Sequence, residues 1–341
     1  MASQQYYSEE TLAWLLGEDC PSVRYFTLRD ILGYSQEDSS VKEAQGLIMI
    51  SGLVPQILSE IRDPAYQNYI HRFYHAKYLG LVWQTLVLAE LGAGSNDQIK
   101  NLCEYLLDHS QVEESGGFST QPSSKSSGGQ PGPVIPCLSG NVVWALLHFG
   151  YIDDPRLHKG IIWIVDHLHV RDGNQSKEQD PRFTRFSDCW GNHSCFMGVI
   201  KSLKALVALP KEHRSAEEIC PNINYAIASM ADFFLIHHIN KRSHDLNAIS
   251  RPGWQKFAFP LMYQTDTLDI LDILTAEGIH DERMIDAIHL VQQKQLPNGR
   301  WKAEYTALNA KLLHPLSQEE MDKFITLKAL RVLKRWQATG N

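Results

Sequence analysis

The chain lacks the features that direct a protein to nucleic acid, to a membrane or to secretion. Its 32 Lys and Arg residues are outnumbered by 39 Asp and Glu residues, and both signs are interspersed along the chain. No basic face for nucleic acid is therefore expected. The N-terminal residues show no basic segment followed by an apolar one, and no apolar run reaches the length that crosses a bilayer. We expect neither a signal peptide nor a transmembrane segment.

Cysteine and strand-forming patterns are also scarce. Six cysteines in 341 residues are too few for a disulfide framework, and reduced thiols in a cytoplasmic protein are the simplest interpretation. No segment with strand-like alternation competes with the helical spacing of the apolar residues. The sequence thus predicts an all-α protein, and its length and 43% apolar content suit one large domain over residues 1–341.

What the chain contains instead is a recurring pair of helices, one apolar and one amphipathic. The first apolar helix is predicted over Tyr74–Leu91, and the ends of four such helices recur at intervals of 58, 59 and 69 residues, near Gly92, Gly150, Leu209 and Gly278. Such a repeat predicts a closed ring of five to six inner–outer helical hairpins, with the more apolar helix inside. Residues 1–64 supply N-terminal helices that complete the ring, and residues 115–136 form a flexible loop rich in Ser, Gly and Pro.

The repeat resembles that of the prenyltransferase and squalene-cyclase family. Each unit there has an apolar helix, a Gly, an acidic-x-Arg step, an amphipathic helix, a Gln or His, and then Gly-x-Trp. The best copy in this chain is Gln293–Trp301, and weaker copies are Gly116–Phe118 and Asp172–Gly173. The resemblance covers most of the chain from Tyr74 onward. It implies a terpenoid-cyclase-like α/α toroid and chemistry on isoprenoid-like or polycyclic molecules.

In such a ring all inner helices run in one direction, so their N-termini crowd one rim. Aligned helix dipoles leave that rim partly positive. Residues just before or within the first turn of each inner helix then become neighbours, and Arg24 of an N-terminal helix joins them. These residues are His71, Tyr74, His75, Cys137, Asn141, Asp188, Cys189, His193, Cys195, Tyr263, Gln264, Asp266, Lys323, Thr326 and Lys328. Below the rim, aromatic residues such as Trp83 and Trp144 would line a shaft that suits a ligand with a polar head and an apolar body.

Zinc is the first chemistry that fits this rim. Its usual ligands are thiolate, imidazole and carboxylate, and a catalytic site uses three protein ligands with a fourth position left open. Cys137, His193 and Cys195 supply such a set. His237 and His238 end an outer helix, where the dipole favours cationic side chains, and no metal is expected there. The resemblance to prenyltransferase β subunits implies another motif, two basic residues followed by Asp and Cys, which is nearly matched by Arg182, Arg185, Asp188 and Cys189.

Metal-free acid–base catalysis, without a cofactor, is the alternative. Asp266, Asp269 and Asp272 are spaced by three residues, which places them on one face of a helix. A carboxyl group that points into an apolar shaft has a raised pKa suited to a proton donor. Asp266 or Asp188 is therefore the expected general acid, and the simpler interpretation of Asp266 is a helix cap.

These observations predict a cytoplasmic enzyme that acts on a small, largely apolar or amphiphilic substrate in a central cavity. The expected reaction is a cyclisation, an isomerisation, or lyase or transferase chemistry. The alternative is a non-catalytic toroid that binds a hydrophobic ligand or serves as a scaffold. Oligomeric state is left open. The expected catalytic residues are Asp266, Asp188, His193, Cys195 and Cys137; the expected anion anchors are Arg24, Arg182 and Arg185; and the expected substrate walls are Tyr74, His75, Trp144 and Tyr263.

Overall fold

The computed structural model describes residues 7–66, 72–123, 127–168, 170–173, 188–214, 219, 221–305 and 309–339. The predicted all-α class is confirmed, because the described residues are mostly helical. The N-terminal part contains α1 (Glu9–Leu15), α2 (Pro21–Phe26), a π-helical turn (Thr27–Ile31), α3 (Ser39–Ile50) and α4 (Leu53–Arg62). It is followed by α6 (Leu81–Glu90), α7 (Asp97–Ser110), α8 (Pro136–His148), α9 (Pro155–His167), α10 (Phe196–Ala208), α11 (Ile223–Ile236), α12 (Thr267–Glu277), α13 (Ile285–Gln293) and α14 (Gln318–Thr339).

Short elements connect the helices. A two-stranded antiparallel ribbon, β1 (Lys241–Arg242) with β2 (Asp245–Ile249), follows α11. Single 3₁₀ turns are found at Pro64–Tyr66, Lys211–His213, Pro252–Gln255, Glu282–Met284 and Asn309–Lys311.

The helix ends follow local sequence signals. The side chains of Asp154 and Asp266 accept hydrogen bonds from backbone N–H groups in the first turns of α9 and α12. Gly278 ends α12 with a φ of +87°, a left-handed conformation that favours glycine. One prediction was too long: the apolar helix expected from Tyr74 begins only at Leu81, because residues 72–80 form turns.

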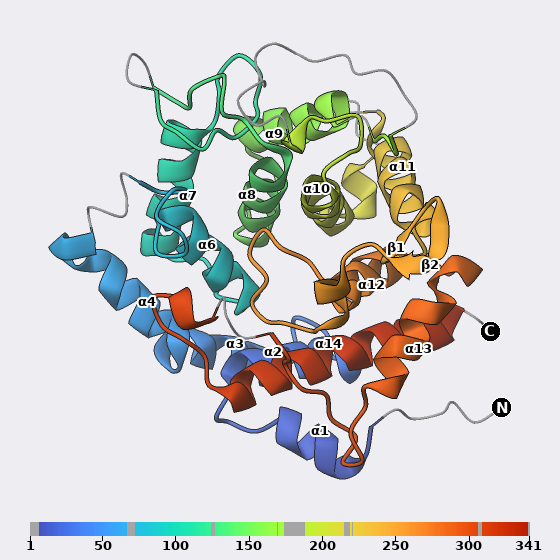
Figure 1. The fold of residues 1–341 in the computed structure, drawn as a ribbon. Coiled ribbons are helices and arrows are strands. Elements are labelled where there is room, and N and C mark those ends of the chain that lie inside the picture. Colours follow the sequence, from blue (N-terminus) through green and yellow to red (C-terminus); the bar gives the residue numbers. More distant parts are fainter. Residues whose placement is uncertain are drawn as a thin grey trace.

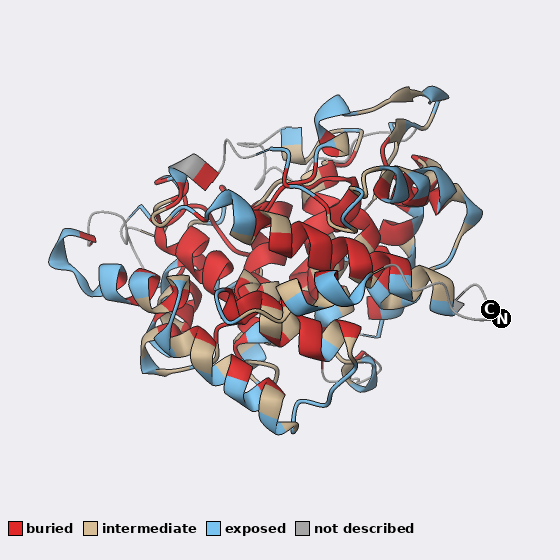
Figure 2. Cartoon of the chain, turned by 90° about the horizontal axis from the view of Figure 1, so that it is seen from below, coloured by how far each residue is buried: buried red, intermediate tan, exposed pale blue. Residues whose placement is uncertain are grey.

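The apolar helices pack against one another in sequence order. α6 contacts α8, α8 contacts α10, α10 contacts α12, and α12 contacts α14. The intervening helices α7, α9, α11 and α13 each pack on the apolar helix before them and lie toward the periphery (Figure 1). Residues Leu81–Ala89 of α6 are all buried, and Figure 2 shows the buried residues concentrated in the middle of the molecule. The more apolar member is the more enclosed one in the pairs α6–α7, α8–α9 and α12–α13, whereas the outer helix α11 is more apolar than α10.

A glycine permits the closest of these helix contacts. A Cβ atom placed on Gly140 of α8 would lie 2.4 Å from the backbone carbon of Lys201 on α10. No side chain fits in that space, so the two helix backbones meet directly there. This contact also sets the position of Lys201, whose ammonium group points toward α12.

The Ser/Gly/Pro-rich region 115–136 is anchored where the structure describes it. Isolated antiparallel bridges join Gln111 to Phe118, Ser119 to Val134 and Pro122 to Gly129. Phe118 and Val134 are fully buried. These residues tie the loop to the ends of α7 and α8.

One segment passes a test for membrane-spanning helices based only on length and composition. It covers Ser39–Arg62 among the described residues, and such a match alone is weak support for a span. The structure divides this segment into α3 and α4 at Gly52, which has a φ of +73°. The absence of a transmembrane segment stays a prediction.

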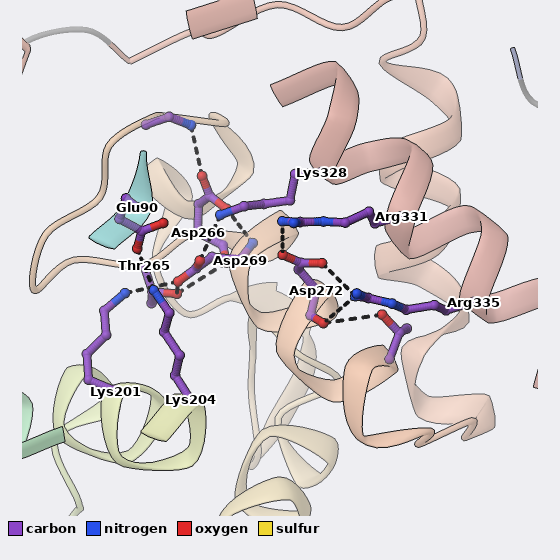
Figure 3. Close-up of polar contacts among 12 residues, drawn as sticks. Glu90, Lys201, Lys204, Thr265, Asp266, Asp269, Asp272, Lys328, Arg331 and Arg335 are labelled. Carbon is purple, nitrogen blue, oxygen red and sulfur yellow. Dashed lines mark hydrogen bonds and ion pairs between the residues drawn. The ribbon is translucent and has the colours of Figure 1, made fainter. Parts of the chain in front are cut away.

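Buried charges connect three of the apolar helices. Asp269 of α12 lies 3.0 Å from the ammonium nitrogens of both Lys201 on α10 and Lys328 on α14 (Figure 3). Its side chain is 6% exposed and that of Lys201 is 2% exposed. Burial alone would raise the pKa of Asp269, but the lysines outweigh it and lower the pKa. The carboxylate therefore stays charged and holds both lysines in place.

We expect Asp269→Asn to destabilise the fold strongly. The substitution removes the carboxylate that pairs with both buried ammonium groups, and breaking a buried ion pair typically costs about 3–5 kcal/mol. Urea unfolding followed by circular dichroism measures the loss. The matched control is Asp286→Asn, which removes the exposed partner of Lys241 and should change the free energy of unfolding by less than about 1 kcal/mol. Equal effects of the two variants would contradict the role given to Asp269.

Candidate functional site

Aromatic side chains that precede different apolar helices meet at one end of the helix assembly. The ring centroid of Tyr74 lies 5.1 Å from that of Trp83, and Tyr263, from the segment before α12, lies 6.1 Å from Trp83. The rings of Tyr78 and Tyr263 are stacked at 6.5 Å. The ammonium of Lys77 is 4.4 Å from the centre of the Tyr263 ring, a cation–π distance. The predicted walls Tyr74 and Tyr263 therefore belong to one cluster.

Three thiols lie beside this cluster. Cys137 is in the first turn of α8, Cys195 immediately precedes α10, and the Cys189 thiol donates a hydrogen bond to Cys195. That bond, helped by backbone N–H groups in the first turn of α10, lowers the pKa of Cys195 to about 6. Burial raises the pKa of Cys137 to about 12. Cys137 and Cys189 are also close enough to Tyr74 to raise its pKa, although burial is the larger cause.

A different group in the same region has the composition of a metal site. Asp172, His193 and His237 each present one ligand atom, and the three atoms lie within 4.8 Å of one another. The Nε2 atoms of both histidines are 3.2 Å from Oδ1 of Asp172. The His237 side chain is 4% exposed and the His193 side chain 40% exposed. The group is thus enclosed on one side and accessible on the other.

The hydrogen bonds of the two imidazoles determine which nitrogen faces Asp172. Nδ1 of His193 lies 2.8 Å from the carbonyl oxygen of Ser194, and Nδ1 of His237 lies 3.0 Å from that of Lys241. Because a carbonyl oxygen only accepts, each Nδ1 must carry the proton, and each neutral ring has its lone pair on Nε2. When both rings are neutral, three electron-pair donors converge at this place.

His237 supports this assignment in a second way. Burial lowers the pKa of its imidazole, which favours the neutral ring. Its buried Nε2 atom lies 3.2 Å from Oδ1 of Asp172, at ion-pair distance, and this carboxylate acts on the pKa against the effect of burial. A buried imidazole nitrogen beside a carboxylate either pairs with it as an imidazolium or, as the neutral ring, shares a cation with it.

Local structure fixes the positions of all three ligands. Asp172 and His193 face each other across an isolated antiparallel bridge, in which the Ser194 N–H donates to the Arg171 carbonyl at 2.8 Å. His237 follows the last turn of α11. Its ring centroid lies 4.9 Å from that of Phe196 and 5.5 Å from that of His193. Aromatic packing therefore restricts the rotation of both imidazoles.

The structure places the sequence-predicted residues in different environments. Of the proposed zinc ligands Cys137, His193 and Cys195, only His193 belongs to the convergent group. Asp188 is exposed. His71, Arg182 and Arg185 lie outside the described residues.

Asp266 is a buried helix cap. Its Oδ1 atom accepts from the Asp269 N–H at 2.8 Å and its Oδ2 atom from the Ala258 N–H at 2.9 Å. Burial and the nearby charge of Asp269 raise its pKa to about 7, the direction expected for a proton donor. With both oxygens engaged by backbone donors, the geometry favours the capping interpretation.

The remaining predicted residues are spread over the molecule. Arg24 of α2 donates to the Leu16 carbonyl at 3.0 Å. His75 is exposed, and its ring packs edge-on against Tyr74 with centroids 5.6 Å apart. Trp144 lies toward the C-terminal end of α8, where the Lys204 ammonium is 3.4 Å from the centre of one of its rings.

Sequence reasoning missed two of the three convergent ligands. The sequence indicates Asp172 only as part of a weak Asp-Gly repeat and His237 only as a residue that complements a helix dipole. The absence of a metal at His237 stays a prediction. In the sequence, only the residue types Asp and His indicate a possible metal ligand. Their proximity depends on the packing of α11 against α10, which no local pattern predicts.

A cavity of about 260 Å³ lies among the apolar helices, away from the convergent group. It is lined by Phe26, Ala89, Glu90, Trp144, His148, Lys204, Phe259, Asp269, Asp272, Ile273, Phe324, Leu327, Lys328 and Arg331. Figure 3 shows its charged side chains pointing toward one another from α6, α10, α12 and α14. Of the aromatic residues expected to line a shaft, Trp144 belongs to this lining, which is partly charged.

Comparison with known proteins adds no assignment: no protein-family model matches the chain, and no curated protein matches it either. The functional inferences therefore depend on the residues of the chain and their geometry.

The assignment of protons to His193 and His237 can be tested directly. In the metal-free protein at pH 8, we expect both imidazoles to carry the proton on Nδ1, because each Nδ1 donates to a carbonyl oxygen. Long-range ¹H–¹⁵N NMR correlation of ¹⁵N-labelled histidines distinguishes the two tautomers. His238→Ala should leave both signals in place. A spectrum with the proton on Nε2 of either ring would contradict the convergence of lone pairs.

Proposed function

We propose that this protein is a zinc-dependent enzyme built on a closed α/α toroid. The toroid is supported by the order of helix contacts. The series from α6 through α14 is continued by contacts of α14 with α2, α2 with α3, α3 with α4, and α4 with α6. Such an order returns to its starting helix, as a ring of helical hairpins requires.

The zinc proposal rests on one observation, the convergence of two imidazole lone pairs and a carboxylate oxygen from Asp172, His193 and His237. Zinc prefers nitrogen, sulfur and carboxylate ligands in tetrahedral geometry, and imidazole also suits other first-row metals. The backbone carbonyls that accept from Nδ1 provide the outer hydrogen bonds that usually orient metal-binding histidines. The donor set therefore fits zinc.

Three protein ligands are the number found in catalytic zinc sites, where a fourth position stays open for water or substrate. The partial exposure of His193 and Asp172 supports access to that position. Zinc bound there would polarise a substrate oxygen or make its water acidic. The residues of the chain would hold the ion, keep both imidazoles in one tautomer, and shield His237 from solvent.

The reaction class follows the expectation from the sequence: isomerisation, cyclisation, or lyase or transferase chemistry on a small amphiphilic molecule. The cluster of Tyr74, Tyr78, Trp83 and Tyr263 offers an aromatic wall at the same end of the apolar helices. A cytoplasmic location is also proposed. It is supported by the free state of the five described cysteines, Cys20, Cys103, Cys137, Cys189 and Cys195.

Metal binding is the first test. We expect the purified protein to bind about one zinc ion per chain, measured by elemental analysis and isothermal titration. His237→Ala and Asp172→Asn each remove a ligand and should weaken binding by at least about 100-fold, since loss of an outer-shell partner alone costs 10–100-fold. His238→Ala is the matched control, because it alters the neighbouring imidazole, which is not in the group.

The same titration tests the other zinc ligands. If Cys137→Ser and Cys195→Ser abolish binding while His237→Ala does not, the thiol site predicted from the sequence replaces the Asp172 group. A wild-type protein that binds no zinc would remove the zinc proposal.

The pH dependence of binding provides an independent measurement. A protonated imidazole has no lone pair for the metal, so affinity should fall as the pH drops below about 6. Because burial lowers the pKa of His237, the part of the decrease that comes from protonation of this ligand should lie below the range of an ordinary histidine. Zinc titrations at a series of pH values measure this curve. An affinity that stays constant down to about pH 5 would contradict histidine ligation.

A further inference from the structure

The charged cavity differs from the zinc group in both position and chemistry. Glu90 and His148, which line it, are the last residues of α6 and α8, whereas the zinc group lies beside the N-terminus of α10. Its volume of about 260 Å³ is near the lower limit for small-molecule sites. The cavity therefore has room for a compact organic ligand.

The acidic groups of the cavity are nearly saturated. Asp269 accepts from Lys328 through Oδ1, and from Lys201 and Thr265 through Oδ2. Both oxygens of Asp272 are also engaged, by arginines of α14 at 2.7 and 2.8 Å. Glu90 pairs with a lysine through Oε1. Of the six carboxylate oxygens on these three residues, only Glu90 Oε2 is not engaged by a described residue.

The cationic groups of the cavity keep unused donors. An ammonium group has three N–H donors. Lys204 uses one on Glu90, and Lys328 uses one on Asp269. Arg331 donates to Asp30 and Asp272 through its two terminal nitrogens, while its buried Nε has no partner among the described residues. The free hydrogen-bonding capacity of the cavity therefore suits an anion.

The other walls of the cavity are apolar. Phe259 and Phe324 are stacked with ring centroids 3.8 Å apart, and Phe26 also contributes to the lining, whereas the Trp144 ring already carries the Lys204 ammonium. A simple inorganic anion would leave these aromatic surfaces without a contact. A ligand with a charged end and an apolar body would use both kinds of wall.

We propose that this cavity binds a small organic monocarboxylate with an aromatic or short alkyl body, and that Lys204, Lys328 and Arg331 hold its carboxylate. The site goes beyond the zinc proposal and does not depend on it. A carboxylate accepts several charge-assisted hydrogen bonds, which are stronger than those of a neutral acceptor. The aromatic walls then exclude water from the body of the ligand.

The wild-type protein and four probes, three of them with the same phenylpropyl body, provide the first experiment. We expect 3-phenylpropionate to bind with a dissociation constant of about 1 mM or tighter, by isothermal titration or ligand-observed NMR. The neutral 3-phenylpropanamide and the cationic 3-phenylpropylamine should bind at least about tenfold more weakly. Inorganic phosphate tests the apolar contribution and should also bind more weakly.

Each probe also has a result that overturns the proposal. Equal binding of the amide would show that charge is not recognised, and preferred binding of the amine would reverse the assigned sign. If phosphate binds more tightly than 3-phenylpropionate, the cavity does not recognise the apolar body of the proposed ligand. If 3-phenylpropionate does not bind, the proposed carboxylate site is wrong. These measurements do not use zinc, so their failure is distinct from failure of the zinc proposal.

Two variants at one ion pair locate the site. Glu90→Gln removes a negative charge beside Lys204 and keeps an oxygen that can accept its hydrogen bond, so 3-phenylpropionate should bind several-fold more tightly. The double variant Glu90→Leu with Lys204→Met removes the cation and its counter-charge together, which avoids an unpaired buried charge. Its affinity for 3-phenylpropionate should fall at least about tenfold.

A variant elsewhere on α14 provides the control. Lys323 is also a buried lysine in an ion pair, with Asp19, and it does not line the cavity. Lys323→Met should leave binding of 3-phenylpropionate unchanged. Equal loss in Lys323→Met and in the double variant would contradict the location. If the double variant does not fold, an unchanged or weakened affinity in Glu90→Gln would still overturn the role of Lys204.

Discussion

The ion pairs of Asp269 are the contacts on which the interior of this protein depends. One carboxylate on α12 neutralises Lys201 from α10 and Lys328 from α14, and each of these groups would be costly to bury alone. The same contacts define a wall of the cavity, since Asp269 and Lys328 are part of its lining. In the proposed carboxylate site, helix packing and ligand recognition would be coupled, because the charges that join the apolar helices also line the cavity.

The two proposed sites use opposite electronic features of the same helix assembly. Beside the N-terminus of α10, Asp172, His193 and His237 converge as electron-pair donors, an arrangement that favours a cation. Farther along the apolar helices, the acids are already paired, and the unused groups are N–H donors of Lys204, Lys328 and Arg331. That arrangement favours an anion. At both sites, the neighbouring hydrogen bonds determine whether a cation or an anion is preferred. An imidazole whose Nδ1 donates a proton can accept only through Nε2, and a carboxylate whose oxygens are both engaged no longer attracts a further cation.

Sequence reasoning succeeded where the physical signal was local. Apolar spacing predicted the helices, and Gly92, Gly150 and Gly278 were correctly placed after helix ends, each with a positive φ. Of the residues expected to meet before separate helices, Tyr74 and Tyr263 lie on either side of Lys77, whose ammonium is 6.0 Å from the first ring and 4.4 Å from the second. The sequence could not show which side chains of that region converge on one another. Cys195 and His193 are two residues apart, yet His193 joins Asp172 while Cys195 receives a hydrogen bond from Cys189. Side-chain direction outside a regular helix depends on backbone pairing such as the bridge between Asp172 and His193.

By itself, the sequence determined the helical class and the alternation of apolar and amphipathic helices, because both follow from residue spacing within a few turns. It also supplied the chemical groups. Only the tertiary structure decided their use. Asp269 became the shared partner of two lysines because α10, α12 and α14 meet around it, and His237 entered the convergent group because α11 packs on α10. Such roles depend on distances and directions between side chains far apart in the chain, and these are set by packing of the whole molecule rather than by local pattern.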